Sequence, residues 1–296
     1  MTRCATVAIV GRPNTGKSTL LNAILEMHLS IVTPKPQTTR RRVLGIDTTG
    51  ETQLIFLDTP GLLKPKYRLQ RSMMGYVEES LNEADIICVV VDTPKAIARG
   101  TVLDPMWQEE LMKRKRPTVL VLNKMDAVGI RKEALPLMDE ASKSGLFTTA
   151  IAISAKDNKY VDDLLKILRE LAPEAPFAFD PDMASDQTDR FFVSEFIRES
   201  VFKQFIEEVP YATEAMITEF KENDEGKWYI SADIVVEREN QKAIIIGAGG
   251  AALKKIGSTA RATIEEYLGH PVYLELYVKV RRDWRNDRAQ LASMGY

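Results

Sequence analysis

The sequence is poor in the residues that build disulfide frameworks and metal centres. Its 296 residues include two cysteines and two histidines. Neither Cys4 nor Cys88 stands at a metal-ligand spacing, so we expect no disulfide scaffold and no zinc site. Histidine is also too scarce for an enzyme built on imidazole catalysis. We expect both thiols to be buried or chemically idle in a reducing compartment.

Long apolar runs are missing as well. The longest purely apolar run, Ile86–Val91, falls far short of the roughly 20 residues that cross a bilayer. The N-terminal segment has no apolar core of signal-peptide length before its first Gly and Pro. These absences predict a cytoplasmic protein.

Charge of one sign is not in excess, because 40 Lys and Arg residues face 42 Asp and Glu residues, a formal net charge of −2. Binders of nucleic acid usually carry a basic excess, so this balance argues at first sight against that class. The charge is unevenly distributed, however. Residues 191–241 hold 5 basic and 12 acidic side chains, a net of −7, and residues 242–296 hold 9 basic and 5 acidic side chains, a net of +4. We therefore expect one basic face near the end of the chain and no indiscriminate binding of nucleic acid.

Residues 1–172 alternate short β-branched runs with amphipathic stretches. This alternation predicts an α/β fold with a mostly parallel sheet covered on both faces, whose ligand binds at the carboxyl ends of the strands. The predicted strands are Thr6–Val10, Gln53–Asp58, Ile86–Asp92, Thr118–Asn123 and Thr149–Ile153. The predicted helices are Ser18–Leu29, Leu69–Ala84, Asp104–Lys113, Lys132–Lys143 and Val161–Leu171.

A shift in composition at residues 173–190 predicts an extended linker, because the segment is rich in proline and acidic residues and lacks periodicity. Residues 191–296 predict a smaller α+β domain in the order α-β-β-α-α-β, followed by a basic tail. Its expected elements are a helix at Phe191–Glu208, strands at Glu214–Lys221 and Trp228–Glu237 joined by a hairpin turn at 223–226, a short helix ending at Gly247, a helix at Ala251–Tyr267 and a strand at Val272–Val280.

The segment GRPNTGKS, residues 11–18, fits the pattern G-x-x-x-x-G-K-[ST] between a predicted strand and a predicted helix. In that context the backbone N–H groups wrap phosphate oxygens at a helix N-terminus. Lys17 is expected to reach the β- and γ-phosphates, and the Ser18 hydroxyl to ligate Mg²⁺. The residues expected to line the phosphates are Gly11, Arg12, Pro13, Asn14, Thr15, Gly16, Lys17, Ser18 and Thr19.

Three later segments, each at the end of a predicted strand, select the nucleotide. In DTPG, Asp58 is placed to hold Mg²⁺ through water, and the Gly61 N–H to meet the γ-phosphate. In NKMD, Asp126 can accept hydrogen bonds from guanine N1–H and its exocyclic amine, which adenine does not offer. ISAK can present N–H groups to guanine O6. The expected contacts are Asp58, Thr59, Pro60, Gly61, Leu62, Asn123, Lys124, Met125, Asp126, Ser154, Ala155 and Lys156.

Together these segments predict a GTPase that binds GTP and GDP with Mg²⁺. A P-loop ATPase or small-molecule kinase is the rival class, and it conflicts with NKMD and ISAK. Switch I is expected between Leu29 and Leu44, where Thr39 is the favoured Mg²⁺ ligand and Thr38 the alternative. Leu62 replaces the Gln that orients the attacking water in Ras-like enzymes, so slow turnover is expected. The predicted catalytic residues are Lys17, Thr39, Asp58 and Gly61.

The segment GAGG, residues 247–250, joins two predicted helices through a G-x-x-G loop. In KH domains such a loop clamps the RNA backbone, and the element order resembles the type II KH fold. A degenerate KH fold kept as a scaffold is the alternative. Trp284 in the basic tail either stacks on a base or packs on the sheet. The predicted RNA contacts are Gly247, Ala248, Gly249, Gly250, Lys254, Lys255, Arg281 and Arg282.

Over essentially its whole length the chain resembles the Era family of translation-factor-like P-loop GTPases. The motifs GRPNTGKS, QTTRR, DTPG, NKMD and ISA and the C-terminal module carry the resemblance. It implies GTP hydrolysis coupled to maturation of the small ribosomal subunit, with binding near the 3′ end of 16S-type ribosomal RNA. Asn14 suggests potassium activation, because several relatives with Asn at this position resemble K⁺-activated GTPases. The plainer alternative is that Asn14 satisfies the loop backbone.

We expect a monomeric switch in which GTP orders switch I and switch II, the latter at about residues 62–71, and thereby gates access of RNA to the KH domain. The alternative function is a membrane-associated adaptor with a peripheral inner-membrane fraction, which would link nucleotide state to growth control. The predicted helix Phe191–Glu208 counts against it, because this helix carries more acidic than basic residues.

Overall fold

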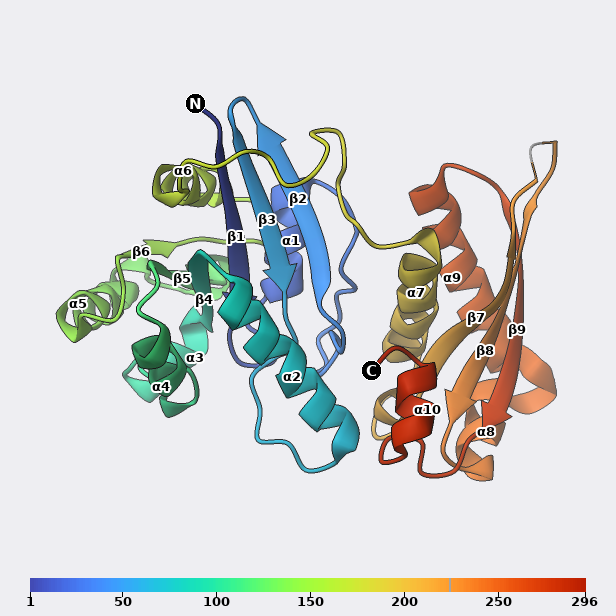
Figure 1. Ribbon diagram of the computed structural model, residues 1–296. Coiled ribbons are helices and arrows are strands. Elements are labelled where there is room, and N and C mark those ends of the chain that lie inside the picture. The colour runs from blue at the N-terminus through green and yellow to red at the C-terminus, as the bar shows by residue number, and fades with distance from the viewer. Residues whose placement is uncertain (224) are drawn as a thin grey trace. The chain divides into compact units, whose positions relative to one another are not determined.

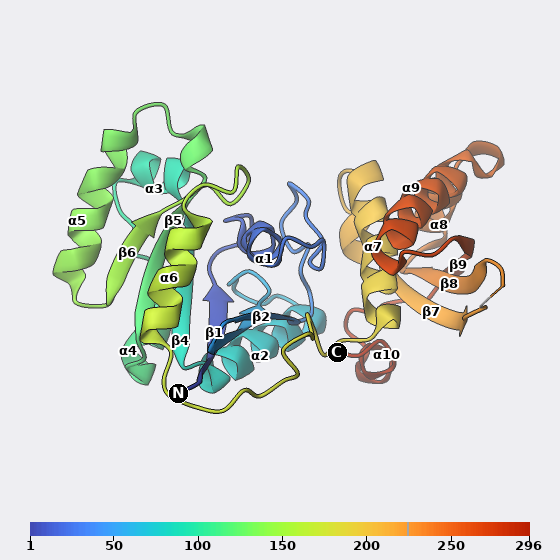
Figure 2. The ribbon, with the colours of Figure 1, turned by 90° about the horizontal axis from the view of Figure 1, so that it is seen from above.

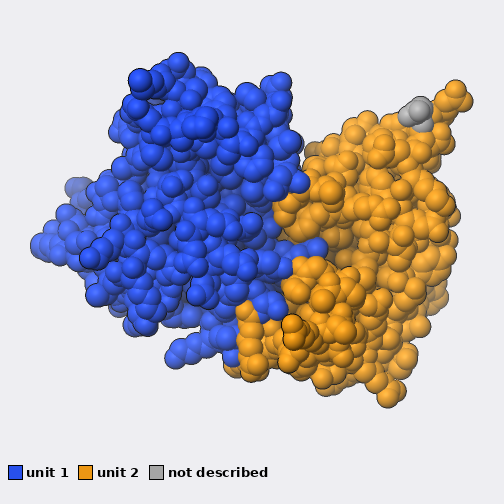
Figure 3. Space-filling model, viewed as in Figure 1, with its two compact units in different colours: residues 1–30, 39–65, 72–186 blue, residues 31–38, 66–71, 187–296 orange. Residues whose placement is uncertain are grey.

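The chain forms two compact units in the computed structural model, which describes residues 1–223 and 225–296 (Figure 1). The first unit comprises residues 1–30, 39–65 and 72–186. The second comprises residues 187–296 together with residues 31–38 and 66–71, two stretches that we call the switch segments (Figure 3). Their grouping with the C-terminal residues was not predicted from the sequence.

A six-stranded sheet in the order β2-β3-β1-β4-β5-β6 forms the centre of the first unit. β2 is antiparallel to β3 and the other neighbouring pairs are parallel, so the predicted α/β fold with a mostly parallel sheet is confirmed. β2 was not predicted, because its sequence VLGIDTT contains Gly and Asp and its pairing with β3 supplies the stability. The strands are β1 (Arg3–Val10), β2 (Val43–Thr49), β3 (Thr52–Asp58), β4 (Ile86–Asp92), β5 (Thr118–Asn123) and β6 (Thr149–Ala152).

Helices cover both faces of this sheet, and α1 and α2 lie on opposite sides of it (Figures 1 and 2). α1 and α6 contact each other and β3. On the other face, apolar side chains of α2, α3, α4 and α5 join those of β1, β4 and β5 in one buried cluster. The helices are α1 (Lys17–Leu25), α2 (Arg68–Glu83), α3 (Thr93–Arg99), α4 (Pro105–Arg114), α5 (Leu135–Ser144) and α6 (Val161–Leu171).

Helix α1 is shorter than predicted. It ends at Leu25 rather than Leu29, because the side-chain oxygen of Asn22 accepts the N–H groups of Leu29 at 3.1 Å and Ser30 at 2.8 Å. These hydrogen bonds turn the chain away from the helix axis. The short helix α3, also absent from the prediction, begins at an Asp92 N-cap that accepts the Lys95 N–H.

The predicted linker at 173–190 is held against the first unit over most of its length. The Cys4 N–H donates to the carbonyl of Pro173 at 3.2 Å, and the Ile46 N–H donates to that of Ala184 at 2.8 Å. Gln53 Oε1 accepts the N–H groups of Ala178 and Phe179 at 2.9 and 3.0 Å. Residues up to 186 therefore belong to the first unit, which composition alone did not indicate.

The second unit is built on a three-stranded sheet in the order β7-β8-β9, with β7 antiparallel and β9 parallel to β8. Its element order, α-β-β-α-α-β, is the predicted one. Part of the predicted turn at 223–226 lies outside the described residues. The elements are α7 (Asp189–Gln204), β7 (Glu214–Lys221), β8 (Trp228–Val236), α8 (Glu239–Ile246), α9 (Ala251–Leu268), β9 (Val272–Val280) and α10 (Arg288–Ser293).

Helix α7 ends at Gln204, although the sequence predicted Glu208. The ammonium of Lys35 donates to the carbonyls of Phe202 and Phe205, so a distant side chain satisfies the last turn of the helix. Among the described helices of both units, none is long and apolar enough to cross a bilayer.

Candidate functional site

The P-loop, residues 11–18, runs from the end of β1 into α1. Gly16 has a φ of 94°, and a Cβ there would lie 2.3 Å from Nδ2 of Asn123. The same amide donates to the carbonyl of Thr15 at 2.9 Å. The phosphate loop and the NKMD segment are therefore joined directly, and glycine is the residue that this close approach allows.

Lys17 is buried at the start of α1. Its ammonium donates to the carbonyls of Gly11 at 3.4 Å and Arg12 at 3.2 Å. Burial lowers the pKa of Lys17 to about 8, although attraction by Asp58 opposes the shift. A phosphate group in the loop would favour the charged form, so this lysine is suited to bind an anion.

Three oxygen-bearing side chains meet beside Lys17. The Ser18 hydroxyl lies 2.8 Å from that of Thr39 and donates to Asp58 Oδ2 at 2.7 Å. Burial raises the pKa of Asp58, while Lys17 and the hydrogen bond from Ser18 oppose this rise. Among the described residues, Asp58 Oδ1 has no hydrogen-bond partner. Two hydroxyls and a carboxylate with an unused buried oxygen form a donor set that suits Mg²⁺.

Thr38, the alternative Mg²⁺ ligand, is engaged elsewhere. Its hydroxyl lies 2.6 Å from that of Thr33 and donates to the carbonyl of Lys35 at 2.8 Å. Of the two threonines, the neighbouring Thr39 is the one whose hydroxyl lies within hydrogen-bond distance of Ser18. The geometry thus favours Thr39 over Thr38.

The DTPG segment packs tightly against the P-loop. A Cβ on Gly61 would lie 2.6 Å from the backbone nitrogen of Pro13, so a larger residue there would displace the loop. The Leu62 N–H donates to the carbonyl of Gly11 at 2.9 Å, and the Leu62 side chain is buried in the core. Leu62 contributes packing at this position, with no polar group to orient water.

The strand ends β5 and β6 bring the base-recognition motifs together. The Ala155 N–H donates to Asn123 Oδ1 at 3.0 Å, and the Ser154 hydroxyl donates to Asp126 Oδ1 at 2.7 Å. A cavity of about 270 Å³ lies beside them and is lined in part by Met125, Asp126 and Ser154. Lys156 is exposed and does not line it.

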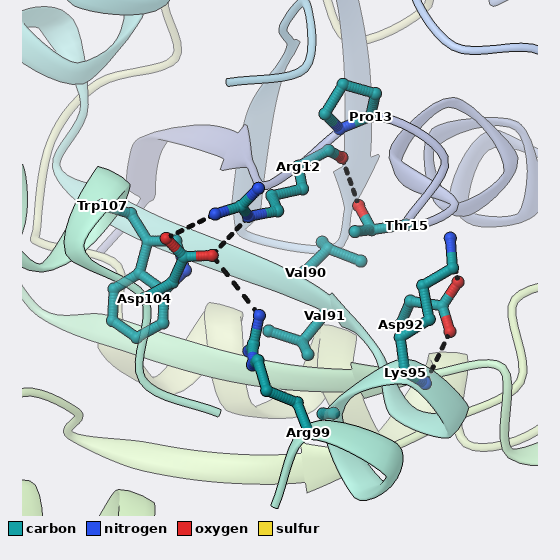
Figure 4. A pocket seen from close by; sticks show the side chains of 11 residues that line it. Arg12, Pro13, Thr15, Val90, Val91, Asp92, Lys95, Arg99, Asp104 and Trp107 are labelled. Atoms are coloured by element: carbon teal, nitrogen blue, oxygen red, sulfur yellow. Dashed lines mark hydrogen bonds and ion pairs between the residues drawn. The ribbon is translucent and has the colours of Figure 1, made fainter. Parts of the chain in front are cut away.

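The sequence analysis missed two acidic residues beside the P-loop, Asp92 and Asp104, whose side chains Figure 4 shows. Arg12 pairs with both carboxylate oxygens of the buried Asp104, and Arg99 lies 3.6 Å from the same carboxylate. Lys124 donates to Asp92 at 2.8 Å. A cavity of about 240 Å³ is bordered by Arg12, Arg99, Asp92 and Asp104. Both aspartates precede a proline-containing helix start, which signals an N-cap but not a link to the P-loop.

In the second unit, the GAGG loop joins α8 to α9. A Cβ on Gly247, whose φ is 71°, would lie 2.7 Å from that of Ala252. A groove of about 470 Å³ begins at Gly250 and runs between α9 and β9, where Lys254 and Arg261 line it. The sequence analysis missed Arg261, which lies two helical turns beyond Lys254 on the same face.

The basic tail differs from one of its predicted roles. Trp284 is fully buried, and its indole N–H donates to the carbonyl of Ala212 at 3.0 Å. The prediction that Trp284 stacks on a base is therefore wrong. The side chain packs inside the protein instead. Arg282 is exposed and Arg281 is partly exposed, so both remain accessible.

Fold and site define the class of the protein as a P-loop GTPase domain followed by a KH domain. Two family models agree with the two parts. The model described as 50S ribosome-binding GTPase matches residues 6–124, and the model described as KH domain matches residues 208–285.

Relatives then specify the family. The proteins named GTPase Era of Clostridium tetani and Geotalea daltonii are 40% and 43% identical to this chain over 290 and 294 residues. The alignments cover 98% of this chain and 97% and 96% of those relatives. This chain belongs to the GTPase Era family and is a GTP hydrolase.

Solved structures are similar over the same length. A crystal structure of Era in complex with MgGDPNP and nucleotides 1506–1542 of 16S ribosomal RNA matches with a TM-score of 0.94 at 40% identity. An Aquifex aeolicus Era variant bound to GDP and AlF4⁻ matches with a TM-score of 0.93, also at 40% identity. Each match covers 100% of this chain and 99% of the other.

Proposed function

We propose that this chain binds 16S-type ribosomal RNA near its 3′ end under the control of GTP, and thereby assists assembly of the small ribosomal subunit. The observation that carries the proposal is the G-x-x-G loop beside a groove lined by Lys254 and Arg261. A relative with this fold was crystallised with that RNA segment. The GTPase domain is assigned to residues 1–172, the linker to 173–190 and the RNA-binding domain to 191–296.

In the proposed nucleotide complex, Lys17 and the N–H groups of the P-loop neutralise the phosphates. Ser18 and Thr39 would be the residues that hold Mg²⁺, and Asp58 would hold it through water. When bound, Mg²⁺ supplies positive charge at the β- and γ-phosphate oxygens. The Gly61 N–H contacts the γ-phosphate, and these interactions strengthen as charge develops there in the transition state.

Recognition of the base is assigned to the β5 and β6 strand ends. Asp126 accepts the two guanine donors, and the Ala155 N–H meets guanine O6. The Ser154 hydroxyl, 2.7 Å from Asp126 Oδ1, holds the carboxylate in place. The remaining contacts proposed for the nucleotide are Asn123, Lys124, Met125, Lys156, Thr59, Pro60 and Leu62.

A potassium ion held at Asn14 is proposed to supply the positive charge that an arginine finger supplies in other GTPases. Asn14 has a φ of 65°, and its carbonyl accepts from Lys124, so its backbone is held firmly in the loop. Asn14→Ala is expected to abolish any difference in GTP turnover between KCl and NaCl, while GDP affinity stays constant. Equal rates of the unaltered protein in both salts would contradict the K⁺ proposal.

Coupling between nucleotide and RNA is proposed to run through the switch segments. Within the second unit, the Val32 N–H donates to Glu199 Oε1 at 3.0 Å, and the Leu69 N–H donates to the carbonyl of Arg285 at 2.9 Å. A γ-phosphate that reorders these segments would therefore act on α7 and the C-terminal tail. GTP and GDP then favour different states of the RNA-binding domain.

The proposed RNA contacts are the GAGG loop, residues 247–250, with Lys254, Lys255, Arg281 and Arg282. Crosslinking to cellular RNA with the protein loaded with GTP or with GDP tests the proposal. We expect recovery of the 3′ end of 16S-type ribosomal RNA, in different yield for the two nucleotides. Recovery of none in either state would contradict it.

We further propose a monomer in the cytoplasm. The peripheral membrane adaptor remains the second candidate, but it requires a helix that presents a basic amphipathic face. Helix α7 does not provide one, because its residues from Phe192 to Phe202 are buried. Sedimentation of the protein with anionic vesicles tests the second candidate, and no binding would exclude it.

A further inference from the structure

Helices α7, α8 and α9 lie on one face of the sheet of the second unit, and among the described residues no helix covers the other face (Figure 2). Strand register places side chains of alternate residues on opposite faces. Leu276 faces α9, since a Cβ on Gly257 would lie 3.5 Å from its Cδ1. Residues of the other parity point away from α9. They include Tyr229 and Asp233 of β8, which pair in register with Tyr273 and Tyr277 of β9.

Aromatic rings dominate this open face. The rings of Tyr229 and Tyr273 are stacked, with centroids 6.0 Å apart and planes at 15°. Tyr273 is 58% exposed and Tyr277 is 49% exposed. Grouped exposed tyrosines are costly to hydrate and are typical of interaction sites, where tyrosine is enriched among the residues that dominate binding.

Carboxylates lie between the rings. Tyr229 donates to Glu275 Oε2 at 2.6 Å. Tyr229 and, to a lesser extent, Tyr277 hold the pKa of Glu275 below its usual value, so the carboxylate is charged at neutral pH. Asp233 is buried beside Tyr277 and pairs with Lys279 at 2.7 Å. Among the described residues, its second oxygen, Oδ1, has no hydrogen-bond partner.

Cations already contact this surface from its border. The ammonium of Lys221 lies 5.5 Å from the centroid of the Tyr229 ring, and its side chain is largely exposed. The Lys279 side chain, which pairs with Asp233, is also more than half exposed. Contacts of exposed cations contribute little free energy, so an incoming cation can replace these lysines at little cost.

We propose that the tyrosine face, made of Tyr229, Asp233, Tyr273, Glu275 and Tyr277, is a docking surface for an arginine-rich segment of a protein partner. A guanidinium plane stacks on tyrosine and forms paired hydrogen bonds with a carboxylate, so alternating rings and carboxylates match arginine better than lysine. Tyr273 also lines the proposed RNA groove between α9 and β9, whereas the other four residues of the face do not line it. RNA is a poor occupant, because the carboxylates would repel its phosphates.

The test uses the full chain and a fluorescent peptide in which Arg alternates with Gly, with binding measured by anisotropy. A peptide in which Lys replaces Arg and a single-stranded oligouridine serve as the competing probes. We expect saturable binding of the Arg peptide and affinity several-fold lower for the Lys peptide. Failure of the Arg peptide to bind, or equal affinity for both peptides, would overturn the proposal.

Variants locate the site. Tyr277→Ala and Glu275→Gln should each lower the affinity for the Arg peptide about threefold to fivefold, as expected for the loss of one cation–π contact or one charged hydrogen bond. Tyr277→Phe, which keeps the ring, should bind as the unaltered protein does. Lys254→Ala, in the proposed RNA groove, is the matched control and should affect only the oligouridine.

The outcomes separate this proposal from the proposed function. If the tyrosine variants weaken binding of oligouridine and leave binding of the peptide unchanged, the face is an RNA surface and the proposal is wrong. If Lys254→Ala does not affect oligouridine while the peptide results hold, the proposed RNA groove fails and the docking proposal stands. Circular dichroism checks that each variant is folded. We expect folding to be retained, because the substituted tyrosine is largely exposed.

Discussion

Arg198 of helix α7 donates to the carbonyl oxygen of Thr38 at 2.6 Å, across 160 positions of sequence. Arg198 is fully buried, and its guanidinium also pairs with Glu195. Burial acts to lower the pKa of Arg198, but attraction by Glu195 and Glu214 outweighs it and raises the pKa. A permanently charged donor therefore holds the peptide that precedes Thr39, the proposed Mg²⁺ ligand.

Arg198→Lys tests this hold. Lysine keeps the charge but cannot pair with Glu195 and reach Thr38 with two separate nitrogens. We expect GTP turnover at saturating Mg²⁺ to fall about fivefold, the equivalent of one hydrogen bond, with GDP affinity unchanged. Lys203→Arg, which keeps the ion pair between position 203, a partly exposed site, and the buried Glu199 on the same helix, is the control. A parallel loss of GDP affinity would point to general disruption instead.

Asp126→Asn should change which nucleotide the site accepts. The amide would present a donor where guanine presents its exocyclic amine, so GTP affinity should fall at least about 100-fold. Xanthosine triphosphate carries an oxygen at that position and should bind the variant better than GTP does. Isothermal titration with both nucleotides measures the change. Unaltered GTP affinity would mean that Asp126 does not contact the base.

The ion pair between Arg12 and Asp104 should give a pH-dependent contribution to stability. Burial alone raises the pKa of Asp104, but hydrogen bonds from Arg12 and the Met106 N–H outweigh it and leave the pKa below the ordinary 3.8. A carboxylate with a lowered pKa stabilises the fold above its unfolded pKa, and this stability is lost as pH falls through the folded pKa. Asp104→Asn should therefore lower the free energy of unfolding at neutral pH and lower it less in acid.

We expect Asp104→Asn to lower the free energy of urea unfolding by about 1–2 kcal/mol at neutral pH, because Arg12 is half exposed and solvent screens the pair. The difference from the unaltered protein should shrink below about pH 4. Asp139→Asn, at an exposed pair with Lys143, should cost less than about 0.5 kcal/mol. A difference that persists undiminished in acid would exclude the ion pair as its cause.

Gly250→Asp should repel RNA without displacing neighbouring atoms. A Cβ at Gly250 meets nothing within 4 Å, although its φ of 81° adds about 1 kcal/mol of strain. Gly269→Asp is the matched control, since Gly269 has a φ of 63° and equally open surroundings. Binding of single-stranded RNA should be lost in the first variant alone. Equal binding by both would show that the GAGG loop does not hold RNA.

The nucleotide site was predictable because its motifs are contiguous. In a P-loop the phosphate ligands are neighbouring backbone N–H groups and two adjacent side chains, Lys17 and Ser18. Residues that are close together in the sequence are therefore also close together in the fold. The strand ends Asp58, Asn123 and Ser154 were placed by one rule, that parallel strands of such a sheet end at the same edge. Helix ends were less predictable, because Asn22 and Lys35 terminate α1 and α7 through contacts that no local propensity encodes.

By itself, then, the sequence determined the α/β and KH elements, the GTP-binding motifs and the G-x-x-G loop, since each depends on residues close together in the chain. Only the tertiary structure decided that residues 31–38 and 66–71 belong with the C-terminal unit, that Trp284 is buried and that tyrosines and carboxylates share one open sheet face. These relationships join residues far apart in sequence. Their free energy comes from desolvation and paired charges, which appear when the chain has folded.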